Sequence, residues 1–366
     1  MSGFEDRLRR LILDHGPISI ARYMALAMAH PTAGYYPRRD PLGAAGDFVT
    51  APEVSQLFGE LLGLALLQHW LELGSPERVA LVELGPGRGT LMADAVRAIR
   101  TLPQAMPALS IHLVETSPAL RERQAAALSG LPVSWHDELG GVPGDRPLLL
   151  VANEFLDALP VRQFVRRAGR WHERMVAVDP EAGLRFAVAP RATPFPDAVG
   201  GVAADPADGT VLELAPAREA LAEAVALRLA AQGGMALLID YGSDRPVMTG
   251  DSLQAVRRHA PADPLREPGE ADLSSHVDFR ALARRCAPAA AVFGPLPQGE
   301  YLQRLGIEVR LGSLLRRATP AQRETLESGC ARLLSTEAMG TLFKVLALAD
   351  PRGPVPPGFH EDERWS

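Results

Sequence analysis

Short apolar runs and helical patterns follow one another along most of this chain. The run from Val79 to Leu84 has the length and composition of a buried strand, and 91–99 then places apolar residues on one face of a helix. Further buried strands are predicted at 110–115, 133–137, 148–154, 234–241, 289–293 and 340–348. Strands that alternate with helices predict an α/β domain built on a mostly parallel sheet.

Other patterns precede or interrupt this α/β domain. Amphipathic helices are predicted over 4–14 and 19–30, and a long, very apolar helix over 54–73. Between 161 and 189 the pattern shortens and alternates, with Gly169 in a turn, which indicates an inserted β-hairpin. A helical region therefore comes before the sheet, and a β-rich segment interrupts it.

These patterns predict three regions. We expect an N-terminal helical and substrate-loop region over 1–75, and an α/β domain over 76–350 with insertions at about 160–209 and 243–335. The last stretch, 351–366, is rich in proline and charge and is expected to be a mobile tail. The polar stretch 250–279 is predicted to be a long irregular loop with a functional role.

Composition narrows the class of protein. A hydrophobic content of 47% supports a sizeable core, and a net charge of −6 argues against a nucleic-acid binder. Cys286 and Cys330 cannot form a disulfide framework or a cysteine metal site, so we expect a reducing compartment and no metal. The mixed charges of the first residues do not resemble a signal peptide, and the apolar run 61–67 is too short to span a membrane. We therefore expect a cytoplasmic protein without membrane insertion.

The turn after the first central strand carries the candidate chemistry. Glu83 ends the strand, and Gly85, Gly87 and Gly89 follow at alternating positions before Thr90. The dinucleotide fingerprint is G-x-G-x-x-G, and Thr90 stands where its third glycine would be. An acid followed by G-x-G-x-G instead resembles the first motif of class I S-adenosylmethionine (SAM) methyltransferases. The third glycine would then serve the ligand and not helix packing. An ordinary strand-to-helix turn and a NAD site remain alternatives.

Polar residues at the ends of later strands extend this site. Glu115 is placed to accept hydrogen bonds from both ribose hydroxyls, with an exposed strand-end carboxylate as the alternative, and Asp137 is placed to meet an adenine amino group. Asn153 and Glu154 end the fourth strand, where open α/β sheets bind ligands. Asp157 lies just beyond them and is either a reaction-centre residue or a helix cap.

Several sequence blocks resemble the MidA-like methyltransferase family, which includes the mitochondrial complex I assembly factor that methylates an arginine. The blocks run from about residue 23 to 348. They are His30-Pro31 with Gly34-Tyr35-Tyr36, Gly46-Asp47-Phe48 with Thr50-Ala51-Pro52-Glu53, the glycine motif, Asn153-Glu154-Phe155 with Asp157-Ala158-Leu159-Pro160, Asp240-Tyr241-Gly242, His276-Val277-Asp278-Phe279, and Met339-Gly340 with Phe343-Lys344. The segment 250–258 departs from the more aromatic stretch expected there, so the acceptor pocket is expected to differ.

The resemblance implies a Rossmann-like seven-stranded sheet with an added helical and β substrate region, SAM as cofactor, and an arginine-bearing protein, such as a complex I subunit, as partner. Carboxylates suit a guanidinium, which is planar and cationic. The acceptor candidates are Glu154, Asp157, Asp47 and Asp278, with His276 as a possible proton acceptor. Thr50 joins the cofactor set, which otherwise comprises Glu83, Gly85, Gly87, Gly89, Thr90, Glu115, Asp137 and Asn153.

Three other classes of protein share features of this chain and remain alternatives. A small-molecule O- or N-methyltransferase would share the cofactor half, and an NAD-dependent oxidoreductase would share the strand-turn-helix unit. A non-catalytic assembly protein would keep the same fold without turnover. The sequence assigns no oligomeric state.

Overall fold

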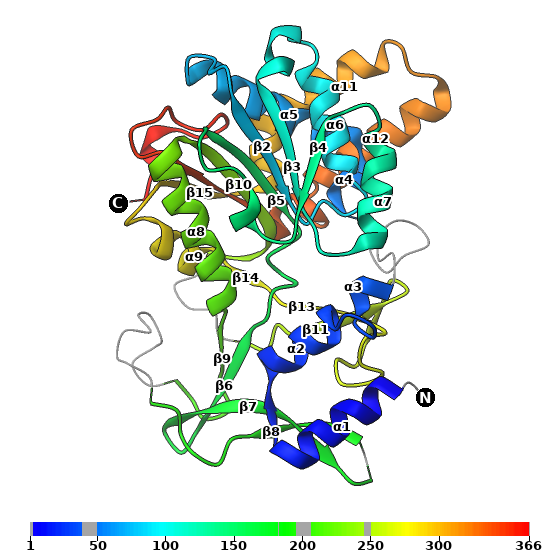
Figure 1. Ribbon diagram of the computed structural model, residues 1–366, viewed down its shortest axis with the longest axis vertical. Helices are drawn as coiled ribbons and strands as arrows, with labels where there is room; N and C mark the ends of the chain where they lie inside the picture. The colour runs from blue at the N-terminus through cyan, green and yellow to red at the C-terminus, as the bar shows by residue number, and fades with distance from the viewer. Residues whose placement is uncertain (1–2, 39–49, 182, 195–205, 245–249, 366) are drawn as a thin grey trace. The chain divides into compact units, whose positions relative to one another are not determined.

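The computed structural model describes residues 3–38, 50–181, 183–194, 206–244 and 250–365 (Figure 1). They form two compact units, each assembled from three stretches of chain. Unit 1 comprises Met1–Phe48, Asp157–Ala220 and Ser243–Arg280, and unit 2 comprises Val49–Leu156, Leu221–Gly242 and Ala281–Ser366. The candidate Asp47 lies outside the described residues.

Unit 2 holds the central sheet. Its strands are β2 (Val79–Leu84), β3 (Leu109–Val114), β4 (Val133–His136), β5 (Leu148–Asn153), β10 (Gly234–Ser243), β15 (Ala291–Pro297) and β16 (Phe343–Ala349). They pair in the order β15-β16-β10-β5-β2-β3-β4, with the last five parallel to one another. Strand β16 runs antiparallel to both of its neighbours, β10 and β15. The prediction of a Rossmann-like seven-stranded fold is confirmed.

The order of the strands locates a ligand crevice. From β2 the chain moves outward to β3 and β4, and it then returns to β5 on the other side of β2. Such a reversal leaves a crevice beyond the carboxyl ends of the two central strands, which is where open α/β sheets bind their ligands. The glycine turn follows β2, and Glu154 follows β5.

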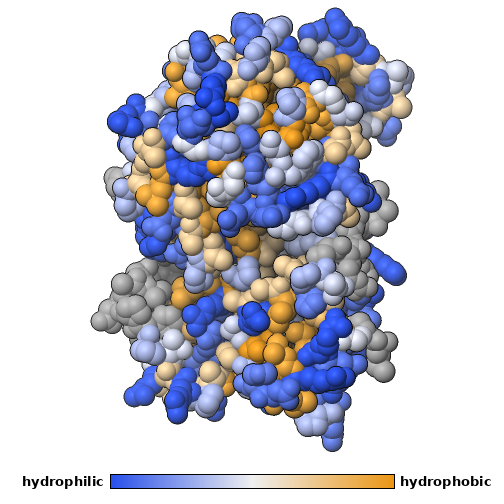
Figure 2. All heavy atoms as spheres, viewed as in Figure 1, coloured by the Kyte–Doolittle hydropathy of each residue, from blue (hydrophilic) through white to orange (hydrophobic). Residues whose placement is uncertain are grey.

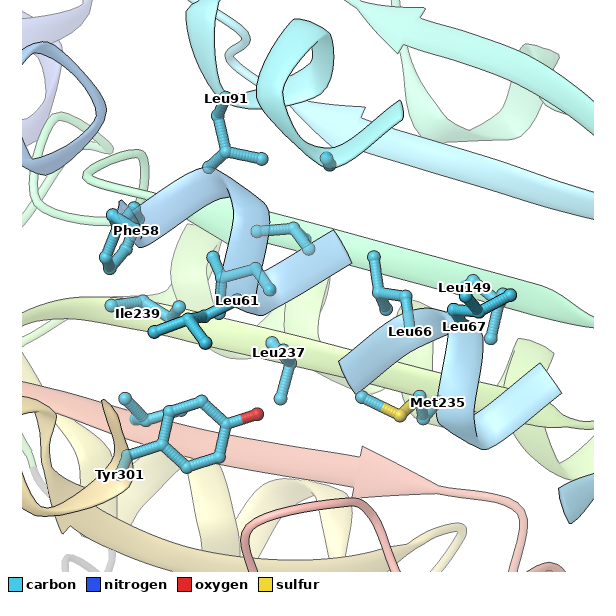
Figure 3. Packing of buried hydrophobic residues seen from close by; sticks show 14 of the residues in the cluster. Phe58, Leu61, Leu66, Leu67, Leu91, Leu149, Met235, Leu237, Ile239 and Tyr301 are labelled. Atoms are coloured by element: carbon cyan, nitrogen blue, oxygen red, sulfur yellow. The ribbon is translucent and has the colours of Figure 1, made fainter. Parts of the chain in front are cut away.

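Helices cover this sheet. They are α4 (Ala51–Val54), α5 (Gln56–Glu72), α6 (Thr90–Ile99), α7 (Pro118–Ala127), α8 (Pro216–Gln232), α9 (Phe279–Cys286), α10 (Gln298–Arg304), α11 (Ile307–Leu315), α12 (Pro320–Leu334) and α13 (Met339–Leu342). Helix α5 is apolar around most of its circumference and is buried. Figure 3 shows its Phe58, Leu61 and Leu66 packed over Leu237 and Ile239 of β10. The predicted long apolar helix is confirmed, although it begins after a separate short helix, α4.

The C-terminal segment packs on unit 2, in contrast to the mobile tail that its composition suggested. The Trp365 backbone N–H donates to the Val292 carbonyl at 2.8 Å, and the Trp365 indole N–H donates to the Gly294 carbonyl. Phe359 is buried against Phe293 and Tyr301. Two aromatic side chains, Phe359 and Trp365, therefore anchor a stretch that proline and charge content had marked as unstructured.

Unit 1 combines helices and two small sheets. Its elements are α1 (Gly3–His15), β1 (Ile18–Ser19), α2 (Ile20–Ala29), α3 (Tyr35–Arg38), β6 (Arg162–Arg167), β7 (Arg170–Asp179), β8 (Gly183–Val188), β9 (Val211–Leu214), β11 (Gln254–Arg257), β12 (Ala260–Ala262), β13 (Asp272–Ser274) and β14 (Val277–Asp278). The predicted hairpin is β6–β7, with Gly169 at φ +72° in its turn. Strands β12-β11-β13 pair within 250–279, where an irregular loop was expected.

Large exposed apolar side chains lie on different helices: Leu13, Leu71, Leu227, Val309 and Leu342. The face shown in Figure 2 carries mostly hydrophilic residues, with apolar ones between them. Within the described ranges, no helix has both the length and the apolar character needed to cross a membrane.

Candidate functional site

The glycine turn adopts a backbone conformation that residues with a Cβ atom rarely adopt. Gly85, Gly87 and Gly89 have φ values of +63°, +52° and +84°, which lie in the left-handed region. The Gly89 N–H donates to the Pro86 carbonyl at 2.7 Å, which closes the turn. Helix α6 then begins at Thr90, so its first backbone N–H groups lie next to the crevice.

Two of these glycines also make close protein contacts. A Cβ atom at Gly85 would lie 2.5 Å from the Phe155 ring. A Cβ atom at Gly89 would lie 3.3 Å from the Gln124 Cα atom of α7. The expectation that the third glycine does not serve helix packing was therefore wrong, because α7 approaches the turn at that point.

Glu83 lies in β2, and its buried carboxyl group accepts a hydrogen bond from the first turn of α6. Its side chain is 3% exposed, and the Met92 backbone N–H donates to it. Gly89, the N-cap residue of α6, has no side chain to offer, so Glu83 supplies a capping acceptor for the helix. Burial raises the pKa of Glu83 to about 8, against an ordinary value of 4.5.

Two buried oxygens at the ends of β2 and β5 lack a hydrogen-bond partner among the described residues. They are Oε2 of Glu83 and Oδ1 of Asn153. Buried polar atoms are normally satisfied, so such atoms beside a crevice fit a ligand that brings hydrogen-bond donors. A carboxyl group there also fits a ligand with a positive charge. These residues therefore fit the expected cofactor, which carries an ammonium group.

Glu115 is held in place from two sides. The Ser117 N–H donates to its Oε1 at 2.7 Å, and the Gln124 amide donates to its Oε2 at 3.3 Å. Burial raises the pKa of Glu115, and these donors oppose that rise. The carboxylate therefore has a fixed orientation at the end of β3.

Gln124 was not identified from the sequence. It is fully buried on α7, and its amide also donates to the Gly87 carbonyl at 2.8 Å, so it links Glu115 to the glycine turn. Its Oε1 accepts from the Trp135 indole at 2.9 Å. The available signal was its position between Leu120 and Leu128 at a spacing of four, which puts a polar residue on the buried stripe of a helix.

Asp137, expected to meet an adenine group, has a different environment from Glu115. Its side chain is 84% exposed, and Arg121 of α7 pairs with it at 2.6 Å. Arg121 also donates to the Glu115 carbonyl at 2.8 Å. One arginine therefore connects the ends of β3 and β4.

Helix α4 is tied to both sides of the crevice. The Thr90 hydroxyl donates to Oε1 of Glu53 at 2.6 Å, and Arg88 lies 3.7 Å from Oε2 of Glu53. Thr50 is the N-cap of α4, but its side chain makes no capping hydrogen bond. The Ala51 N–H donates instead to Glu154, at 2.9 Å. Glu53 belongs to a sequence block quoted above, yet only the fold shows that it contacts the turn.

Glu154 sits in a strained backbone conformation. Its φ is +48°, which is uncommon for a residue with a Cβ atom and is often found at functional sites. The Asn153 amide donates to its Oε1 at 3.3 Å. The next turn is held by Asp240 of β10, which is fully buried and accepts from the Leu156 N–H at 2.9 Å.

The remaining acceptor candidates lie in unit 1. The Asp157 carbonyl accepts from the Ser275 N–H at 3.1 Å, which brings Asp157 and His276 into neighbouring segments. His276 is half-buried, and burial lowers its pKa. Asp278 is half-buried in β14. Asp157 also lies near Tyr36. Burial is the largest cause of the raised pKa of the Tyr36 phenol, and the charges of Asp272 and then Asp157 add to it.

Comparison with known proteins connects this geometry to a family. The sequence model of a family described as S-adenosyl-L-methionine-dependent methyltransferases matches residues 61–296. The chain is 40% identical to mouse protein arginine methyltransferase NDUFAF7 over 360 residues, covering 91% of this chain and 81% of that protein. It is 38% identical to the human protein of that name, covering 91% and 80%. It is 37% identical to the Drosophila melanogaster homolog, covering 93% and 84%.

Solved structures agree with these matches. A protein of Burkholderia thailandensis crystallised with S-adenosyl-homocysteine is 30% identical, with a TM-score of 0.83, covering 100% of this chain and 96% of that one. A native structure from the same organism gives a TM-score of 0.82 at 30% identity, with the same coverage.

The relatives correct the expected localisation. The curated proteins described above are named as mitochondrial, which contradicts the prediction of a cytoplasmic protein. That prediction rested on the charges of the first residues and on two cysteines. The charges of the first residues bear on targeting, and the two cysteines bear on the redox environment. Neither feature distinguishes the cytoplasm from another reducing compartment.

Proposed function

This chain belongs to the family of S-adenosyl-L-methionine-dependent methyltransferases, and from that premise we propose that it methylates the guanidinium group of an arginine in a protein. The observation that carries this proposal is the similarity, over more than nine tenths of the chain, to proteins named as arginine methyltransferases. The carboxylate of Glu154, directly after β5, supports it, because carboxylates suit a cationic acceptor. As the resemblance implies, the acceptor protein is a subunit of respiratory complex I.

The cofactor half of the proposal uses residues of unit 2. When bound, SAM supplies a methyl group on a positively charged sulfur that is already activated for transfer. The turn Gly85–Thr90 holds the methionine part, with Glu83 facing its ammonium group. Glu115 accepts from the ribose hydroxyls, and Asp137 meets the adenine amino group. Asn153 and Thr50 line the crevice.

The acceptor half uses carboxylates to align the guanidinium. We propose Glu154, Asp157, Asp278 and Asp47 as the carboxylates that orient the planar cation. Alignment at near-attack distance supplies most of what the protein must add, since the methyl donor is already reactive. His276 accepts the proton released after transfer, and burial, which lowers its pKa, favours the neutral imidazole that can accept it.

A proteome comparison tests the proposal. Mass spectrometry of cells with and without the gene should show at least one arginine that loses its methyl groups, and complementation should restore them. A Glu154→Gln gene should restore them poorly. If no arginine changes and a small molecule loses a methyl group instead, the acceptor is not a protein. If no methylation of any kind changes, the chain acts without turnover.

A further inference from the structure

Arg218 is a buried charge that the proposed chemistry does not use. It lies in the first turn of α8, is 1% exposed, and is the bulkiest of the fully buried side chains among the described residues. Arginine is rarely buried, and a cation near a helix N-terminus opposes the helix dipole. Burying a charge is also a poor way to gain stability. The position of Arg218 therefore points to a role other than stabilising the helix.

The guanidinium of Arg218 joins two segments of unit 1. Its Nη1 donates to the His276 carbonyl at 2.7 Å. Its Nη2 donates to the Asp157 carbonyl at 2.9 Å and to the Ser275 hydroxyl at 2.6 Å. The carbonyls of Leu159 and Ser275 lie 3.1 and 3.3 Å from the same nitrogen. The backbone on both sides is thereby fixed by one side chain.

A second set of hydrogen bonds supports the same segments. The Ser275 N–H donates to the Asp157 carbonyl, and the His276 N–H donates to the Ser252 hydroxyl at 3.0 Å. The Ser252 N–H in turn donates to Glu213, at 3.0 Å. Glu213 lies five residues before Arg218. The segment from β9 to the first turn of α8 therefore holds the backbone of Asp157 and His276, through Arg218 directly and through Glu213 by way of Ser252.

We infer that Arg218 is a positioning residue for methyl transfer, which fixes Asp157 and His276 through their backbone carbonyls. This inference rests on the proposed function, in which those two side chains act on the acceptor. A planar guanidinium presents five N–H donors in a fixed fork, so it holds several carbonyls at once. A lysine ammonium keeps the charge but lacks the fork. A lysine side chain at this position would therefore contact fewer of these oxygens, and its charge alone would not hold both segments.

The test compares four variants of the full-length protein. Arg218→Met removes the charge and the fork, Arg218→Lys keeps the charge, and Ser275→Ala deletes one contact in case the first two fail to fold. Arg162→Met is the matched control, since Arg162 belongs to the same unit and pairs with Glu173 on the β6–β7 hairpin. Hydrogen exchange, SAM affinity by calorimetry, and tritium transfer from SAM to an extract of gene-deleted cells are measured for each.

We expect exchange at the 275–276 amides to rise about tenfold in Arg218→Met, less in Arg218→Lys and least in Ser275→Ala. Transfer should fall by about tenfold or more in Arg218→Met, because small displacements of orienting groups are costly. SAM affinity should stay within about twofold of wild type, and Arg162→Met should leave all three readouts near wild type. Recovery of transfer in Arg218→Lys without recovery of exchange would assign the effect to charge.

Failure of this inference is distinguishable from failure of the proposed function. Wild-type exchange at 275–276 in both Arg218 variants overturns the positioning role, as does wild-type transfer in those variants. Absence of arginine labelling by the wild-type protein refutes the proposed function instead, and the exchange measurement still decides whether Arg218 fixes the two segments.

Discussion

The buried carboxyl group of Glu83 makes the stability of the protein depend on pH in a defined direction. Its pKa is about 8 in the folded protein and lies near 4.5 when the group is exposed. Between these values the folded state holds a proton that the unfolded state has released. The contribution of Glu83 is therefore fully present below about pH 4.5 and is lost as the pH rises toward 8.

Glu83→Gln removes this dependence while keeping an oxygen to accept the Met92 N–H. Each pH unit within the window corresponds to about 1.4 kcal/mol, so the variant should gain roughly 3 kcal/mol over wild type between about pH 5.5 and 8. Urea unfolding followed by circular dichroism at several pH values measures this difference. The matched control is Glu122→Gln on the exposed side of α7, which removes a carboxyl group without changing a buried one.

A difference between Glu83→Gln and wild type that stays constant from about pH 5.5 to 8 would refute the reasoning, because it would mean that the carboxyl group ionises in the fold without cost. Ligand binding gives a second readout. If Glu83 faces the ammonium group of SAM, the affinity of wild type for SAM should rise more steeply with pH than that of Glu83→Gln.

Three further predictions concern the crevice. Gly87→Val should abolish SAM binding in calorimetry, because it adds a side chain at φ +52° in the turn. The control Gly130→Val, at φ +79° with nothing within 4 Å of its Cβ, should bind SAM normally. Glu154→Gln should keep SAM affinity near wild type, since its amide oxygen still accepts the Ala51 N–H, yet lower turnover by about tenfold or more; unchanged turnover would make the residue structural. Gln124→Leu should weaken SAM binding by about tenfold and destabilise the protein by about 1–3 kcal/mol, as it leaves the Trp135 indole without its acceptor and the Glu115 carboxylate with the Ser117 N–H but without the Gln124 amide as a donor; equal affinity would contradict this.

The cofactor side of the fold was accessible from sequence because its signals are local. A buried strand, a glycine turn and an amphipathic helix occupy adjacent positions, and Glu115 directly follows the next strand at a spacing set by the βαβ unit. The seven-stranded Rossmann-like sheet followed from the resemblance rather than from these patterns, and the order of its strands comes from the structure.

Long-range contacts were not accessible in the same way. Glu53 reaches Thr90 across 37 positions of sequence, and Arg218 reaches Ser275 across 57. No periodicity links residues that far apart, so only the fold reveals them. The sheet within 250–279 was missed because its strands span three or four residues, too few to establish alternation.

Strand β16 has a consequence for how the protein is made. It is threaded between β10 and β15 and pairs with each of them along most of its length, although it is the last strand to leave the ribosome. Until residues 343–349 emerge, β15 has no neighbour among these strands, and the apolar edge of β10 is uncovered. Nascent chains interrupted before that point should therefore depend on chaperones and be degraded, even when every residue of the glycine turn has already been synthesised.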